Sequence, residues 1–188
     1  MSSDAEIIRR SLSEPTEFGE IFERHFSVVR GYVARRIGAS PAEEITSETF
    51  VIAFKSRERY DMRTVSARPW LLGIATNLIR HHLRDERAHL AAEARTPIAP
   101  APPPTDDTER IDAERLRPLL AQALLSLTVA DRETFLLVAL GGLTYEEAAA
   151  SLDVPVGTVR SRMHRARVTM QDRLATLHLT SQMEEPEG

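Results

Sequence analysis

Residues 143–174 read LTYEEAAASLDVPVGTVRSRMHRARVTMQDRL, a pattern that predicts two helices joined by a tight turn. Thr144 is followed three residues later by Glu147, which is a capping box that satisfies two unbonded backbone N–H groups reciprocally. Pro155 cannot continue a helix and biases the residue before it out of the helical region, so the first helix ends there. Apolar residues then recur at steps of three and four, which places them on one face of a second helix: Val159, Met163, Ala166, Met170, Leu174 and Leu177.

The polar face of this second helix is rich in arginine. Residues 156–173 contain five arginines and one acid, so the helix carries a strong positive charge. Arginine reads guanine edges in the major groove of DNA, and hydroxyl and backbone N–H groups at a helix start hold phosphates. We therefore expect a DNA-reading helix whose contacts come from Val156, Gly157, Thr158, Arg160, Ser161, Arg162 and Arg165. The alternative is an ordinary surface helix with a solvated basic face, which leaves the capping box and the proline turn as coincidences.

The run of residues 143–167 resembles region 4, the promoter-reading domain of the extracytoplasmic-function (ECF, group 4) sigma factors of the sigma-70 family. The family pattern is close to LSYEEIAEILGVPVGTVKSRLHRAR, and this chain matches it directly at residues 145–147, 154–159, 161–162 and 164–167. Asp153 stands where the family usually has Gly. A left-handed turn residue is expected there, and Asp tolerates that conformation better than most residues. The resemblance implies that the second helix reads the −35 promoter element.

Composition narrows the class of protein. The chain has no cysteine, which excludes disulfides and cysteine-based zinc sites, and it has no apolar run of about 18 residues that would span a membrane. Its N-terminus is polar and carries both charge signs, unlike a signal peptide, so we expect a cytoplasmic protein without membrane insertion. The net charge is −4, yet residues 103–153 hold ten acids against four bases, so charge is segregated from the basic helix. This pattern favours docking on a basic partner and weak DNA binding by the chain alone.

The chain divides into five segments, and all of its regular structure is predicted to be helical. We expect an N-terminal tail (1–13), a helical domain (14–91), a linker (92–112), a second helical domain (113–178) and an acidic tail (179–188). The linker contains five of the 11 prolines, so it favours extended structure. At about 3.1 Å per residue it reaches ~65 Å, a little under two turns of duplex DNA.

The first domain shows three helical patterns. Residues 18–37 carry a strong apolar face and end at Gly38, a plausible helix cap. Ser40 and Pro41 are typical of a helix start, so a second helix is expected there. A charged loop without periodicity covers residues 57–66, and a third helix is predicted from about Ala67 toward His89.

The second of these helices resembles sigma region 2.2. Residues 41–50 read PAEEITSETF, against a family form near A-E-D-L-x-Q-E-x-F, with Ser47 in place of the usual Gln. Glu44 and Glu48 are four residues apart and so share one helix face. The resemblance implies docking on the β′ clamp helices of core RNA polymerase through Glu44, Ser47, Glu48 and Phe50. The alternative is a solvated acidic face.

The third helix resembles sigma regions 2.3 and 2.4. Residues 68–84 read RPWLLGIATNLIRHHLR, against P-W-L-x-x-I-A-x-N-x-x-x-D-x-x-R, and His81 stands where the family usually has Asp. The resemblance implies capture of an unpaired −10 base, for which stacking, edge hydrogen bonds and basic side chains are suited. The candidates are Asn77, Arg80, His81 and Arg84 on the helix and Tyr60, Asp61, Met62 and Arg63 in the loop. Trp70 lies in register with Ile74 and Leu78, so we expect it in the core.

These observations predict an ECF sigma factor that binds promoter DNA and core RNA polymerase, at the β′ clamp helices and the β flap, and does no covalent chemistry. The resemblance also implies an anti-sigma factor as partner. We expect no cofactor and no metal, because His82, Asp85 and Glu86 lack a further ligand cluster. Two alternatives remain: a conventional helix-turn-helix regulator, which binds duplex DNA without polymerase, and an adaptor-like interaction protein or helical enzyme.

Overall fold

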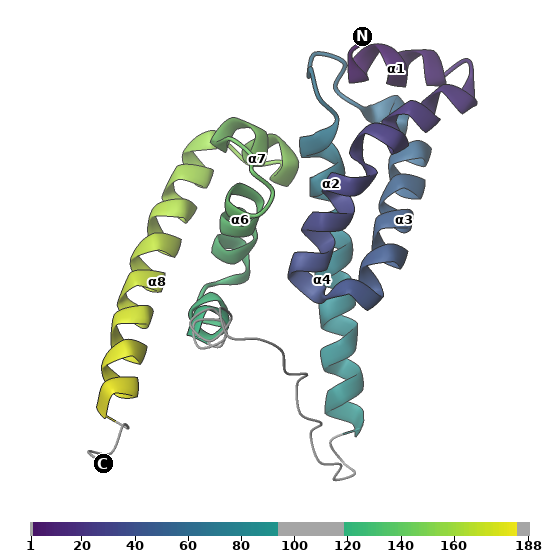
Figure 1. Ribbon diagram of the computed structural model, residues 1–188. Helices are drawn as coiled ribbons and strands as arrows, with labels where there is room; N and C mark the ends of the chain where they lie inside the picture. The colour runs from purple at the N-terminus through teal and green to yellow at the C-terminus, as the bar shows by residue number, and fades with distance from the viewer. Residues whose placement is uncertain (1, 94–118, 184–188) are drawn as a thin grey trace, which may run out of the picture.

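The computed structural model describes residues 2–93 and 119–183, and every regular element in these ranges is helical (Figure 1). The predicted linker (92–112) falls almost wholly outside the described residues. The α-helices are α1 (Asp4–Ser11), α2 (Gly19–Ile37), α3 (Ala39–Ser56), α4 (Arg68–Glu93), α6 (Val129–Ala139), α7 (Tyr145–Leu152) and α8 (Val156–Met183), with 3-10 turns η1 (Pro15–Phe18) and η2 (Arg57–Arg59).

Helices α1 to α4 form the N-terminal group. The apolar face predicted for α2 is confirmed, because Ile21, Val29 and Val33 are fully buried. Gly38 ends α2 with φ +88°, a conformation that favours glycine. The predicted cap at Ser40 is wrong: α3 begins at Ala39 directly after Gly38, and no side chain caps it.

Residues 4–11 correct a second expectation. Residues 1–13 were expected to form a tail, but they contain α1, whose Ile7 and Ile8 side chains are completely buried. Ser3 and Glu6 form a capping box at its start. A helix this short is marginal by itself, so packing against α2 and the segment before α4 is what stabilises it.

The C-terminal group contains α6, α7, α8 and a helical segment at residues 119–125. The capping box predicted at Thr144 is confirmed, and Asp153 adopts the left-handed conformation expected of it, with φ 52°. The apolar stripe of α8 is confirmed from Val159 to Met170, since Val159, Met163, Ala166 and Met170 are buried; Leu174 is partly exposed, and the side chain of Leu177 lies outside the described residues. Helix α8 runs to Met183, five residues beyond the predicted end of the domain at 178.

The two groups pack against each other through α4 and α7, as Figure 1 shows. One continuous buried cluster extends from Ile7 in α1 to Met163 in α8. Between the groups, the Ser151 hydroxyl donates to the Pro69 carbonyl oxygen at 2.6 Å. The sequence suggested two domains that are joined only by a linker, whereas the structure brings them into direct contact.

Candidate nucleic-acid and polymerase interfaces

Helices α7 and α8 form a helix-turn-helix whose geometry follows from its local sequence. The Glu147 N–H donates to the Thr144 hydroxyl at 3.1 Å, and the Thr144 N–H donates to the Glu147 carboxylate at 2.8 Å. The left-handed Asp153 then turns the chain into α8. Because Val159 and Met163 are buried against α7 and α6, the opposite side of α8 faces solvent.

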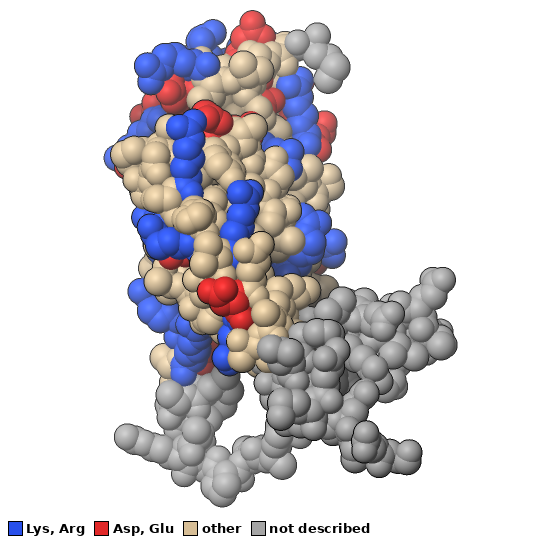
Figure 2. All heavy atoms as spheres, turned by 90° about the vertical axis from the view of Figure 1, so that its left-hand side faces the viewer, with Lys and Arg blue, Asp and Glu red and all other residues tan. Residues whose placement is uncertain are grey.

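The residues predicted to read DNA lie on this outer side of α8. Gly157, Arg160, Ser161 and Arg165 are exposed, and Val156, Thr158 and Arg162 are partly exposed. Figure 2 looks onto this side of the molecule, where Lys and Arg side chains are spread between a larger area of other residues and several acids. The surface therefore has the charge and exposure that contact with a phosphate backbone requires.

Two of the arginines have protein partners. Arg165 donates to the Asp131 carboxylate at 2.7 Å, and Asp131 is only 5% exposed. Hydrogen bonds with the side chains of Arg165 and Thr128 hold the pKa of Asp131 below its usual value. Burial by itself would raise this pKa. Arg160 lies 3.7 Å from Glu146, a pair exposed on both sides and therefore weak. Arg165 is thus fixed in place, while Arg162 has no ion-pair partner among the described residues.

Three of the predicted −10 residues, Tyr60, Asp61 and Asn77, line a cavity of about 520 Å³ at the start of α4. Tyr60 and Asp61 from the loop meet Trp70 and Asn77 from α4 at its walls. The Tyr60 and Trp70 rings lie 5.0 Å apart, centroid to centroid. The cavity falls within the usual range of ligand pockets, about 300–1,000 Å³, and has aromatic walls with polar groups at the rim. Trp70 is half-buried: it packs on the core, as predicted, and also lines the cavity.

Three charged residues line the cavity, Arg59, Asp61 and Asp153, and Asp61 is the one among them that was predicted. The Asp61 carboxylate accepts hydrogen bonds from Arg63 Nε at 2.9 Å and Nη2 at 2.8 Å. These side-chain bonds and one from the Arg63 backbone lower the pKa of Asp61 to about 2, so it is ionised at neutral pH. Met62 and Arg63 do not line the cavity. Arg63 instead extends into solvent, with a side chain that is 90% exposed.

The remaining predicted −10 residues lie along α4, beyond the cavity. Asn77, Arg80, His81 and Arg84 are all exposed and lie on one helix face. Arg80 donates to the Asn77 side-chain oxygen at 3.0 Å, and Arg84 hydrogen-bonds His81. The row is basic, and it begins at the cavity mouth, where Asn77 is a lining residue.

The predicted polymerase-binding residues divide into surface and core. Glu44, Ser47 and Glu48 are exposed on α3, but Phe50 is only 5% exposed. Its ring packs 4.9 Å from that of Phe22, so Phe50 forms the floor of a groove rather than an open contact. This groove, about 350 Å³, was not predicted; it is lined by Phe18, Gly19, Phe22, Ser47, Phe50, Val51 and Phe54. Phe22 is 41% exposed and Val51 is 49% exposed. The apolar spacing of these helices predicts burial, so it gave no sign of this exposed apolar surface.

The contact between the two groups was also missed by the sequence analysis. Arg36 Nη2 lies 2.6 Å from the Glu133 carboxylate, and these side chains are only 3% and 7% exposed. Arg35 and Arg68 donate to the carbonyl oxygens of Leu140 and Gly141, just after α6 ends. Cations are favourable at a helix C-terminus, where carbonyl groups lack partners within the helix. No local pattern signals these contacts, because their partners are far apart in sequence.

The part of the chain that the structure describes shows no group of three or more His, Cys, Asp or Glu side chains placed to hold a metal ion. His82 lies 3.7 Å from the Glu86 carboxylate, a pairing within one helix. Within the same described residues, no helix is both long enough and apolar enough to cross a bilayer.

Two family models match this chain. The model of sigma-70 region 2 matches residues 21–89, and that of sigma-70 region 4 matches residues 117–170. Among curated proteins, the ECF RNA polymerase sigma factor SigC of Mycobacterium tuberculosis is 37% identical over 138 residues, which is 72% of this chain and 71% of the relative. RNA polymerase sigma factor CarQ of Myxococcus xanthus is 33% identical over 168 residues, covering 86% and 91% of the two chains.

Two solved structures share the fold. CnrH, in complex with the cytosolic domain of CnrY, aligns with a TM-score of 0.63 at 24% identity and covers 93% of this chain and 99% of its own. RpoE of Bartonella quintana, in complex with the anti-sigma factor NepR, aligns with a TM-score of 0.59 at 22% identity and covers 85% and 98%.

Proposed function

This chain belongs to the ECF RNA polymerase sigma factors of the sigma-70 family, and from that membership we propose how its surfaces divide the work of transcription initiation. As a sigma factor it directs core RNA polymerase to promoters and is not an enzyme. In our proposal, the outer face of α8 reads the −35 element, and α3 docks on the β′ clamp helices of polymerase. The −10 element is captured by the cavity at the start of α4 and by the exposed side chains that follow it along α4: Asn77, Arg80, His81 and Arg84.

One observation carries this division: apart from the buried Phe50 and Tyr60, most of the predicted contact residues lie on exposed faces of three different helices or in the loop before α4, and each surface has suitable chemistry. Helix α8 is basic on its outer side, α3 presents the Glu44 and Glu48 carboxylates, and the cavity at the start of α4 has aromatic walls with polar groups at its rim. A basic face suits duplex DNA, and carboxylates suit a basic protein surface. A cavity with aromatic and polar walls suits an unpaired base.

Opening of the −10 element needs no catalytic group. Unpairing and unstacking a base costs a few kcal/mol, and the bound base recovers this through stacking and edge hydrogen bonds. The half-buried Trp70 supplies aromatic surface, with Tyr60, only 5% exposed, packed against it, and Asn77 supplies an amide that both donates and accepts. The exposed Arg80 and Arg84 lie next along α4 and are placed to hold the backbone of the displaced strand.

Run-off transcription on genomic fragments tests the proposal, with core RNA polymerase present and the protein added or omitted. Discrete transcripts that need both components are expected, and their start sites define the promoter. Absence of such transcripts, together with tight binding of the isolated protein to duplex DNA, indicates a conventional helix-turn-helix regulator instead.

We also propose that an anti-sigma factor regulates this protein in the cytoplasm, and that the β flap of polymerase contacts its C-terminal group. The anti-sigma proposal is supported by the Bartonella quintana RpoE structure, which contains NepR and shares this fold. A purified candidate anti-sigma factor should suppress the core-dependent transcripts at a one-to-one ratio and leave transcription by other sigma factors unchanged.

A further inference from the structure

Helix α1 is tied to both ends of the segment that forms the outer wall of the α4 cavity. At one end, Arg57 Nε donates to the Ser11 carbonyl oxygen at 3.3 Å, just where α1 finishes. At the other end, the Ala67 N–H donates to the Asp4 carboxylate at 2.7 Å. The eight-residue helix therefore spans the loop that carries Tyr60 and Asp61.

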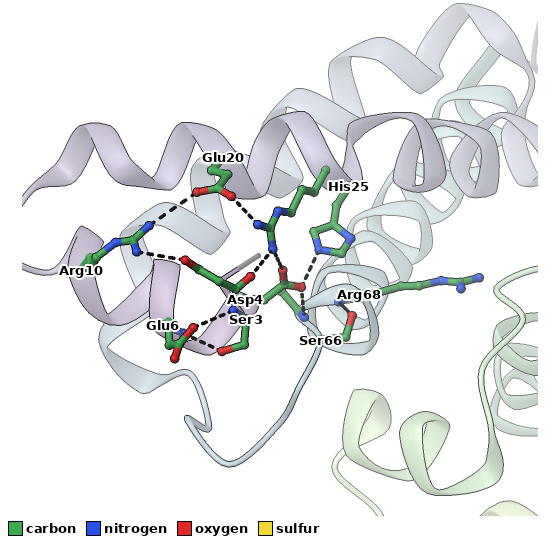
Figure 3. Close-up of polar contacts among 11 residues, drawn as sticks. Ser3, Asp4, Glu6, Arg10, Glu20, His25, Ser66 and Arg68 are labelled. Atoms are coloured by element: carbon green, nitrogen blue, oxygen red, sulfur yellow. Dashed lines mark hydrogen bonds and ion pairs between the residues drawn. The ribbon is translucent and has the colours of Figure 1, made fainter.

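Asp4 is itself held from several sides, as Figure 3 shows. Its side chain is 7% exposed, and its carboxylate lies 2.6 Å from His25 Nε2 and 3.1 Å from Arg24 Nη1, both on α2. Arg24 also donates to the Ser2 carbonyl oxygen at 2.8 Å. One carboxylate thus joins three separate elements: α1, α2 and the residue that precedes α4.

The loop between these ties also has contacts of its own: the Thr64 hydroxyl lies 2.6 Å from the Tyr60 hydroxyl and 2.8 Å from the Asp61 carbonyl oxygen, and Met62 packs against the core. Val65 is 81% exposed, and the Arg63 side chain contacts Asp61, only two residues away. Tyr60 and Ala67 are the buried ends of the segment. An irregular segment of this kind loses much backbone entropy when it is fixed in one conformation, so the ties to α1 at its ends add to these internal contacts in holding its shape.

We propose that Asp4 is a positioning residue for capture of the −10 base. It does not touch DNA: by fixing the Ala67 N–H it sets how the loop with Tyr60 and Asp61 packs against Trp70 beside the cavity. The inference rests on the proposed function of that cavity. It assigns a role in promoter opening to an N-terminal helix that lies outside the residues matched by the region 2 model.

Asp4→Asn tests this role, because the amide has nearly the same size but places an NH2 group among the donors of Ala67, His25 and Arg24. Glu6→Gln is the matched control: it removes one negative charge from the same turn of α1, and Gln still completes a capping box. Arg57→Met loosens the other tie of the loop and serves as a second variant should Asp4→Asn fold poorly.

Holoenzyme made from each full-length variant is titrated with a fluorescent single strand that carries the non-template −10 sequence of a promoter found by run-off transcription. A second strand carries a substitution at the captured base. For Asp4→Asn we expect the affinity for the matched strand to fall about 10- to 100-fold, the usual effect of misplacing a positioned group. Affinity for the substituted strand should fall less, so that discrimination between the strands approaches one. Core affinity and the behaviour of Glu6→Gln should match wild type.

The discrimination ratio separates positioning from folding, since a smaller folded fraction weakens binding of both strands equally. Unchanged discrimination in Asp4→Asn and Arg57→Met overturns the proposal and leaves α1 with a role in stability alone. If the wild-type holoenzyme gives no core-dependent transcript at all, the proposed function fails instead, and that result is seen before any variant is made.

Discussion

The packing of α7 on α4 depends on the absence of one side chain, at Gly73. A Cβ built on Gly73 would lie 2.6 Å from the Ser151 carbonyl oxygen and 3.3 Å from its carbonyl carbon and Cα. These are backbone atoms of α7, so no rotamer change relieves the overlap. Gly73→Ala should therefore disfavour the docked arrangement of the two helical groups.

The size of the effect follows from the geometry. Carbon–oxygen contacts are normally about 3.3–3.6 Å, so α7 must retreat by at least roughly 0.7 Å. Overpacking of this kind costs about 1–3 kcal/mol, and loss of the Ser151–Pro69 hydrogen bond adds about 0.5–1.5 kcal/mol. The docking equilibrium should shift about 10- to 1,000-fold, at tenfold per 1.4 kcal/mol. The N-terminal group itself gains ~1 kcal/mol, because Ala favours a helix over Gly.

Fluorescence transfer between two engineered cysteines measures docking directly, since the chain has no native cysteine. Val28→Cys on α2 and Val168→Cys on α8 place dyes at exposed positions of the two groups. Gly31→Ala on α2 is the matched control, because its new methyl group meets only the flexible end of Arg35 at 3.6 Å. We expect Gly73→Ala to populate a low-transfer state, whereas Gly31→Ala keeps the wild-type transfer efficiency.

Equal transfer efficiency in both variants would refute the reasoning that this close approach controls docking. Glu133→Gln provides an independent check away from the cavity. It leaves the nearly inaccessible Arg36 guanidinium without a charged partner, and breaking a buried pair in this way costs about 3–5 kcal/mol. Glu146→Gln, in the exposed pair with Arg160, should leave docking unchanged.

Three further predictions address the proposed surfaces and the effect of acid. Arg162→Ala should weaken −35 duplex binding by about 1–3 kcal/mol, in a filter-binding assay with holoenzyme, and leave core affinity intact; equal loss of both contradicts the separation of surfaces. Replacing Glu44 and Glu48 with Lys should weaken core binding in a direct titration without changing −35 readout, and unchanged core affinity means that α3 is not the docking face. Burial alone raises the pKa of Asp4, but the Ala67 N–H, His25 and Arg24 outweigh it and hold that pKa below its usual value. Because the folded pKa is depressed, this contribution to stability is complete above the unfolded value of about 3.9 and is lost as pH falls through the folded one. The melting temperature of wild type should thus decline more between about pH 5 and pH 2 than that of Asp4→Asn.

Sequence reasoning succeeded where the determining interactions are local. The capping box of Thr144 and Glu147, the left-handed turn at Asp153 and the apolar stripe of α8 all involve residues a few positions apart. Capping and periodicity act at that range, so the helix-turn-helix was predictable in detail. The overall all-helical fold followed for the same reason.

The failures have a common physical cause, which is dependence on distant partners. Residues 4–11 offered too short a pattern to indicate a helix, and Asp4 finds its partners at Arg24, His25 and Ala67. Arg36 and Glu133 are 97 residues apart. Phe50 matched a family motif, but its inward direction depends on Phe22 from another helix. Contacts between such distant residues produce no periodic pattern in the sequence.

The docking contact and the −10 cavity share residues, and this predicts that DNA capture and docking are coupled. Gly73 and Pro69 line the cavity beside Trp70, and Ala150, Ser151 and Asp153 of the α7 end form its opposite wall. A base that enters between these walls contacts α7 only while the groups are docked, so its affinity differs between the docked and undocked arrangements. Any ligand with such a difference shifts the equilibrium between them.

We expect the base to favour the undocked arrangement, because α7 lies directly against α4 at Gly73 and its end lines the cavity, so a DNA strand reaches Trp70 more readily once α7 has moved away. Titration of the −10 single strand into protein labelled at Val28→Cys and Val168→Cys should then lower the transfer efficiency. The strand with the substituted base is the control and should act only at higher concentration. In Gly73→Ala, already undocked, the same strand should bind more tightly, since apparent affinity rises with the fraction of competent protein. Saturating binding with no change in transfer would show that the base does not enter the cavity between α4 and α7.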